Sequence, residues 1–114
     1  MASVKLEKPA WHAYFDNVSK VLNGKCAEIE VDSLAMGSQI EAEWVPMFGL
    51  VYEPRSDTIE VLLEGIGHLI HKPKEVFVDQ EVNRLTSLEV IDSDDVRHII
   101  KLRDPLLLRA PKVP

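Results

Sequence analysis

Residues 9–32, PAWHAYFDNVSKVLNGKCAEIEVD, decide the fold, because the spacing of the apolar residues changes within them from a helical to a strand period. Pro9 suits the first turn of a helix, and Asn23-Gly24 suits its end. The pattern therefore predicts an amphipathic helix from Pro9 to Leu22 with one buried face. The apolar stripe of this helix consists of Trp11, Tyr14, Phe15, Val18, Val21 and Leu22.

Beyond Gly24 the chain alternates between apolar and acidic residues, which predicts a half-buried strand. Further runs of this kind predict six more strands, and Pro46 separates two of them. Short connectors between consecutive strands indicate hairpins, so an antiparallel sheet is expected. The predicted strands cover residues 27–32, 40–44, 47–52, 58–63, 75–78, 85–91 and 96–102.

The fold class predicted by these elements is α+β. We expect the N-terminal amphipathic helix to pack on a bent antiparallel sheet of six or seven strands, which can close into a partial barrel. The length of 114 residues fits a single domain, residues 1–114. Its ordered core is expected at about residues 4–108, followed by a flexible C-terminal tail.

Two segments between the predicted strands carry more specific expectations. Gly65–Pro73, which contains two glycines, is predicted to form a single helical turn or a loop. If the hairpin closes symmetrically around residues 92–95, Leu88 faces Ile99 and Glu89 faces His98.

Composition places the protein among soluble globular domains, with 46% hydrophobic and 28% charged residues. Its apolar runs are too short to span a membrane, and residues 1–24 do not read as a signal peptide. The single cysteine, Cys26, favours a reducing compartment, so a cytoplasmic location is expected. The net charge of −6 argues against nucleic acid as a partner.

The acidic residues are concentrated in one part of the chain. Residues 25–64 hold nine carboxylates and two cations, whereas residues 97–112 are rich in lysine and arginine. Rows of like charge on neighbouring strands would crowd one another, so we expect either solvation or a basic partner to compensate them. That partner would be the basic patch of another copy or a different protein. The predicted interaction face consists of Glu28, Glu30, Asp32, Glu41 and Glu43.

Candidate metal ligands are few. His68 and His71 are the only closely spaced pair; they would share one face of a helical turn but point to opposite sides of a strand. A zinc site needs three or four protein ligands, and no cysteine pair or third nearby histidine completes a set. No metal site and no cofactor are therefore predicted.

Catalytic motifs are also missing from the sequence. It contains no G-x-S-x-G elbow, no G-x-G-x-x-G, no phosphate-binding G-x-x-x-x-G-K-[ST] and no H-E-x-x-H. Cys26 lies beside Lys25, but a nucleophilic cysteine also needs a positioned base, so Cys26 is interpreted as a structural thiol. No catalytic residue is assigned, and the motifs do not argue for an enzyme.

Four segments carry a resemblance to a known family. They are the helix Trp11-His12-Ala13-Tyr14-Phe15, the strand Glu41-Ala42-Glu43-Trp44, the segment His68-Leu69-Ile70-x-x-Pro73 and the ending Leu102-Arg103-Asp104-Pro105-Leu106-x-Leu108. In this order they resemble an uncharacterised family of short bacterial proteins, a domain of unknown function. The resemblance implies a bacterial cytoplasmic protein and implies no activity.

Two functional classes follow from these observations. The first is a non-catalytic binding or accessory module that acts through contacts with a protein partner or with itself, using the acidic face or an exposed sheet edge. The alternative is a small-molecule or metal-binding protein, with enzymatic activity left open, centred on Gly65–Pro73. Glycines, two histidines and a proline at the exit are what a ligand-gripping loop would use, and a structural loop uses them too.

Overall fold

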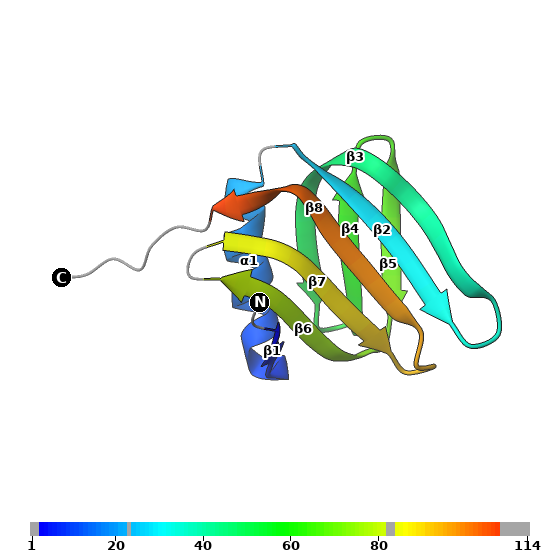
Figure 1. The fold of residues 1–114 in the computed structure, drawn as a ribbon. Helices are drawn as coiled ribbons and strands as arrows, with labels where there is room; N and C mark the ends of the chain where they lie inside the picture. Colours follow the sequence, from blue (N-terminus) through cyan, green and yellow to red (C-terminus); the bar gives the residue numbers. More distant parts are fainter. Residues whose placement is uncertain (1–2, 23, 82–83, 108–114) are drawn as a thin grey trace.

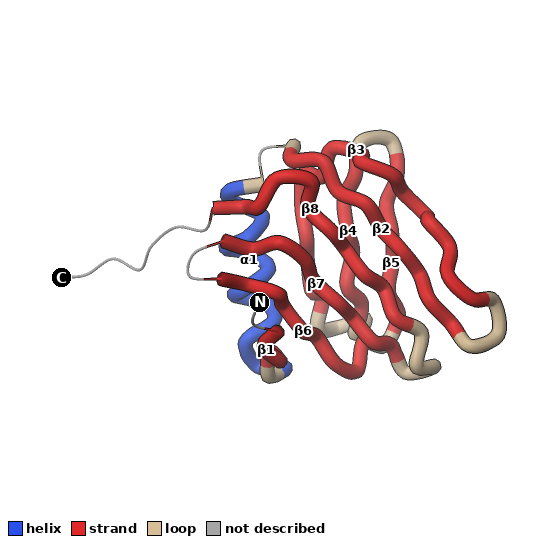
Figure 2. Tube along the Cα trace, in the orientation of Figure 1, coloured by secondary structure: helices blue, strands red, loops and turns tan. Residues whose placement is uncertain are grey.

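The computed structural model describes residues 3–22, 24–81 and 84–107, which form one short helix and a large sheet (Figure 1, Figure 2). The helix α1 spans Trp11–Val21 and follows a 3-10 turn at Lys8–Ala10. Neither of these helices is long and apolar enough to cross a membrane. The strands are β1 (Ser3–Leu6), β2 (Lys25–Ser33), β3 (Gly37–Glu53), β4 (Thr58–Leu63), β5 (Ile66–His71), β6 (Pro73–Glu81), β7 (Arg84–Asp92) and β8 (Arg97–Leu107).

Within the described residues the eight strands form one sheet in the order β1-β6-β7-β8-β2-β3-β4-β5. Every neighbouring pair is antiparallel. Because β1 and β5 lie at the two ends of this order, the sheet is open. The predicted class, a helix on a bent antiparallel sheet, is confirmed, whereas the predicted number of six or seven strands is wrong.

The difference in strand number has local causes. The strand β1 has only four residues and precedes the helix, so it is too short to show an alternating pattern. The segment Gly65–Pro73 is neither a helical turn nor a loop, because Ile66–His71 form the edge strand β5. Gly65, with φ +77°, makes the turn before it. The predicted flexible tail, which follows residue 108, lies outside the described residues.

The sheet bends along β3. This 17-residue strand pairs with β2 through Gly37–Met47 and with β4 through Met47–Glu53. Two predicted strands are therefore one, and Pro46 lies inside it, opposite Cys26. Trp44, with φ 51°, lies next to an irregularity in the pairing that accompanies the change of direction. As a result, β4 and β5 lie behind β2, β8 and β7 in Figure 1.

The helix packs against the second half of β3 with the predicted face. Trp11, Phe15, Val18 and Leu22 are all buried. Ser19 supports this contact, since its hydroxyl donates to the carbonyl of Leu50 and accepts from the same residue's N–H, both at 2.9 Å. The predicted helix and its stripe are therefore confirmed.

The hairpin of β7 and β8 closes one residue away from the predicted register. Ile91 pairs with Arg97, which leaves a five-residue loop where a four-residue connection was predicted. The pairs are Leu88 with Ile100, Glu89 with Ile99 and Val90 with His98, so the predicted pairs of Leu88 with Ile99 and Glu89 with His98 are wrong. Because neighbouring residues of a strand point to opposite faces, this shift decides which face His98 occupies.

Candidate functional site

A histidine lies in the core, on the inner face of β8. The side chain of His98 is buried, as are Ile100 and Leu102 on the same face and its cross-strand neighbour Val90. Among the described residues, only Thr58 shares this combination of polarity and burial. Because buried polar groups are almost always hydrogen-bonded, both ring nitrogens of His98 need partners.

The first partner is Asp92, at the end of β7. Its Oδ2 lies 3.0 Å from Nε2 of His98, while its Oδ1 accepts the backbone N–H groups of Asp94 at 2.9 Å and Val96 at 3.1 Å. Burial alone would raise the pKa of Asp92, but the hydrogen bonds from His98, Val96 and Asp94 outweigh it and hold the pKa below the usual value. Asp92 is therefore an ionised acceptor that the loop itself holds in place.

The second partner is His68 on β5, whose Nε2 lies 2.9 Å from Nδ1 of His98. A carboxylate only accepts, so Nε2 of His98 carries the proton that it donates to Asp92. Nδ1 of a neutral His98 is then an acceptor, and His68 must donate to it through Nε2–H. It follows that Nδ1 of a neutral His68 has a free electron pair, and no described residue donates a hydrogen bond to it.

The environment of His68 favours this neutral form. Burial lowers its pKa and the neighbouring His98 lowers it further, while Glu41 acts in the opposite direction; the pKa stays below 6.5. At neutral pH, His68 therefore presents a hydrogen-bond acceptor. We name the chain Asp92–His98–His68 the carboxylate–histidine relay.

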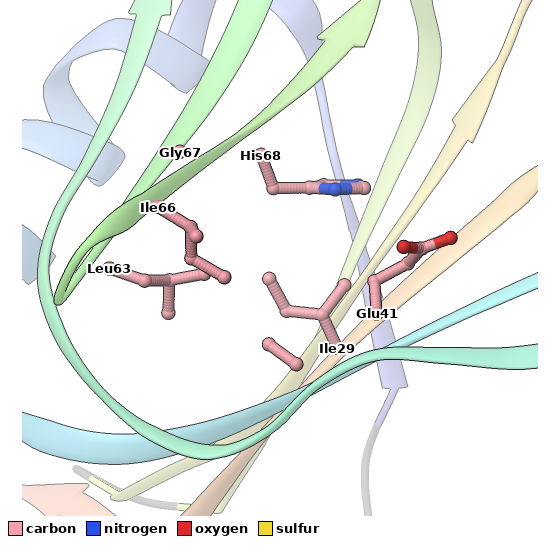
Figure 3. Close-up of a pocket in the computed structure, with 7 residues that line it drawn as sticks. Ile29, Glu41, Leu63, Ile66, Gly67 and His68 are labelled. Atoms are coloured by element: carbon pink, nitrogen blue, oxygen red, sulfur yellow. The ribbon is translucent and has the colours of Figure 1, made fainter.

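The relay ends at a cavity of about 250 Å³. Figure 3 shows the imidazole of His68 and the carboxylate of Glu41 facing this space from β5 and β3. The remaining walls are aliphatic side chains and one glycine, from β2, β3, the end of β4 and β5. The lining residues are Ile29, Glu41, Ala42, Leu63, Ile66, Gly67 and His68.

A β-bulge turns Glu41 towards this cavity. On β2, Ile29 pairs with Ala42 and the next residue, Glu30, pairs with Ile40, so Glu41 has no residue opposite it. Such an extra residue bends the strand and redirects a side chain. Glu41 was predicted to be part of the acidic interaction face, and the structure places it beside His68.

The two predicted metal-ligand candidates do not come together. His68 and His71 are three residues apart on a strand, so they point to opposite sides of β5, and His71 is exposed. Within residues 3–22, 24–81 and 84–107 there is no group of three or more histidine, cysteine, aspartate or glutamate side chains that could hold a metal ion. Cys26 is a half-buried free thiol on β2.

The acidic row of β2 lies beside basic residues of β8. Glu28 pairs in register with Lys101 and Asp32 with Arg97, and Nζ of Lys101 lies 3.7 Å from Oε1 of Glu30. On the other side, Glu30 faces Ile40. Asp32 likewise faces Ser38, so no described pair of β2 and β3 residues places two of these carboxylates directly opposite one another. Of the predicted face, Glu41 and Glu43 are exposed, and Glu28, Glu30 and Asp32 are half-buried.

Sequence reasoning missed Asp92 and His98 as site residues. A usable signal was present, because His98, Ile100 and Leu102 occupy alternate positions of one strand. A histidine in phase with the apolar residues belongs to the buried face and needs a partner. The partner, His68, lies 30 residues away, and no spacing rule connects the two.

Comparison with known proteins gives two matches. The model of a family described as a family of unknown function (DUF5335) matches residues 2–111. A protein of Aquifex aeolicus (strain VF5), described as an uncharacterized protein, is 37% identical over 109 residues, which are 95% of this chain and 98% of that protein. No solved structure matches the chain.

Proposed function

The chain belongs to this family of unknown function, which brings no activity with it, and we propose that it is a small-molecule-binding protein whose site is the cavity at His68. One observation carries the proposal: a hydrogen-bonded relay of three ionisable residues, buried at His98 and half-buried at Asp92 and His68, ends at a cavity with otherwise apolar walls. Small-molecule sites have this composition, with apolar walls and a few positioned polar groups.

The relay is an unusual feature for a purely structural core. Replacing a buried polar pair by apolar residues of similar shape is often neutral or stabilising, so such pairs are weak evidence for a role in stability. Here the relay fixes the ring of His68 and its tautomer. A ring that is already fixed favours ligand binding, because the side chain of His68 loses little conformational freedom when the ligand binds.

The test is a ligand screen on the full chain followed by thermal unfolding and NMR titration. We expect at least one small amphipathic compound to raise the melting temperature of the wild type, and to lose this effect in His68→Ala. His71→Ala is the matched control, since it removes an imidazole from the outer side of the same strand. A screen in which His68→Ala and His71→Ala respond alike would contradict the proposal.

Docking through the acidic face stays a separate proposal. Lys101 lies against Glu30, so part of this charge is already balanced within the sheet. The triple variant Glu28→Lys, Glu30→Lys and Glu43→Lys tests the proposal. If the acidic face docks a partner or a second copy, this variant should differ from the wild type in the mass measured by light scattering or in the capture of a partner. Unchanged results would contradict a docking role.

A further inference from the structure

The polar side chains around the cavity all accept hydrogen bonds. Glu41 offers a carboxylate, which only accepts when ionised. His68 lines the cavity, and its Nδ1 is the ring nitrogen that the relay leaves unprotonated in the neutral form. The other side chains, those of Ile29, Ala42, Leu63 and Ile66, have no polar atom.

From these two acceptors above apolar walls we propose that the cavity binds a primary ammonium group carried on a small apolar body. This inference rests on the proposed function, that the cavity is a ligand site. An ammonium has three N–H donors and no acceptor, so it can serve Glu41 and His68 together. A carboxylate ligand has no donor and would face the negative charge of Glu41. An alcohol has one donor and can satisfy only one of the two acceptors.

The size of the cavity limits the body of the ligand. At about 250 Å³ it lies slightly below the range of about 300–1,000 Å³ typical of sites for drug-sized ligands. One ring or a short branched chain is therefore a suitable apolar body. The aliphatic side chains of Ile29, Leu63 and Ile66 would contact it.

Because the relay makes Nδ1 of His68 a hydrogen-bond acceptor, a substitution at Asp92 should change the group that His68 presents to the cavity. In Asp92→Asn, the amide oxygen can still accept from Asp94 and Val96, and the amide N–H₂ replaces the oxygen that faces His98. Nε2 of His98 must then accept, so its proton moves to Nδ1 and points at Nε2 of His68. The proton of His68 moves to Nδ1, and the cavity acquires a donor in place of an acceptor.

The experiment uses three probes that share a phenyl ring and carry different polar groups: benzylammonium, benzyl alcohol and benzoate. Their affinities for the full chain are measured by NMR titration and calorimetry near pH 7.5. We expect benzylammonium to bind most tightly. Its affinity should fall about tenfold or more in Glu41→Gln and in Asp92→Asn, because each variant removes a charge-assisted or acceptor contact.

Glu43→Gln is the matched control for Glu41→Gln. It removes one negative charge from the same strand, but Glu43 does not line the cavity. Benzylammonium affinity should therefore change less than about twofold in this variant. An equal loss in Glu43→Gln and Glu41→Gln would show general attraction to an acidic protein and would overturn the inference.

The remaining outcomes separate the inference from the proposed function. If benzyl alcohol or benzoate binds as tightly as benzylammonium and His68→Ala abolishes this binding, the cavity is a ligand site but the ammonium inference is wrong. If benzylammonium binds equally well to Asp92→Asn and wild type, the inference is also wrong. If none of the three probes binds in a way that depends on His68, the inference fails. The proposed function fails with it only if the ligand screen also finds no compound that distinguishes His68→Ala from His71→Ala.

Discussion

Nε2 of His68 lies 2.9 Å from Nδ1 of His98, although β2, β3 and β4 separate their strands in the sheet. A flat sheet would hold these rings several strand widths apart, since each step between strands is about 4.8 Å. Their contact therefore depends on the bend of β3, which brings β5 over β8 (Figure 1). The bond ties the two halves of the sheet together at the point where the cavity opens.

Removing the hydrogen bond between His68 and His98 should destabilise the protein. In His98→Leu the volume is roughly kept, but Oδ2 of Asp92 and Nε2–H of His68 both lose their partner. We expect the free energy of unfolding to fall by about 1–3 kcal/mol, the usual cost of leaving a buried polar group unsatisfied. Urea unfolding measures this, with His71→Leu as the control on an exposed surface. Equal effects of the two substitutions would show that the relay adds nothing to stability.

Stability should also depend on pH through His68. Its pKa in the folded state lies below 6.5, the value expected in the unfolded chain. As the pH falls below about 6.5, the unfolded chain therefore takes up the proton first, and the free energy of unfolding decreases. The decrease should continue until the pH passes the folded-state pKa of His68. Below that pH, His68 should contribute no further change to the free energy of unfolding.

Urea unfolding between about pH 8 and pH 5 checks this sign. The decrease between about pH 7 and pH 5 should be smaller in His68→Ala than in the wild type, because the substitution removes the titrating group. His71→Ala should keep the wild-type slope. A wild type that gains stability as the pH falls through this range would contradict the prediction.

Ser19→Ala should weaken the contact between the helix and the sheet. Beyond Met47, β3 no longer pairs with β2, and the hydroxyl of Ser19 supplies both hydrogen bonds to the buried residue Leu50 on that side. We expect a loss of about 1–3 kcal/mol, slightly offset because alanine favours helix by about 0.5 kcal/mol. Thermal or urea unfolding measures it. Ser93→Ala, at an exposed loop residue, should have no comparable effect.

Lys101→Glu should test how the acidic row of β2 is balanced. Lys101 lies beside Glu28 and Glu30 in the sheet, and its side chain is about half exposed. The loss of stability should be under about 1 kcal/mol and should shrink when salt is added, as expected for partly exposed charges. Lys25→Glu makes the same change in net charge, and no ion pair of Lys25 occurs among the described residues. A larger effect of Lys25→Glu would show that local pairing with β8 is unimportant.

The fold could be predicted from the sequence wherever the pattern of apolar residues repeats over several turns of a helix or along a whole strand. The stripe from Trp11 to Leu22 spans three turns, and the alternation around Ile29 spans a whole strand, so both were predicted correctly. The four-residue β1 offers no period, and two glycines conceal β5. Pro46 suggests a break, yet it lies within the pairing of β3 with β2.

The candidate site was less predictable because it depends on register. The alternating pattern predicts only that His98 lies on the same face of its strand as Ile100 and Leu102. Which residues His98 contacts depends on the neighbouring strand and on the length of the loop between them. His68 was singled out for its proximity to His71, a residue on the other face of β5. Its actual partner comes from tertiary bending, for which no local pattern exists.

The bulge at Glu41 means that the site is encoded by a count of residues as much as by their identity. If the segment between β2 and β3 were one residue shorter, regular pairing would place Glu41 opposite Glu30, on the outer face of the sheet. The cavity would then lose the negative charge of Glu41, although the residues of the site would all be the same. Two relatives with the same histidines and glutamate but hairpins differing by one residue should therefore differ in ligand preference. Insertions and deletions in this hairpin are the first place to look when specificity within the family diverges.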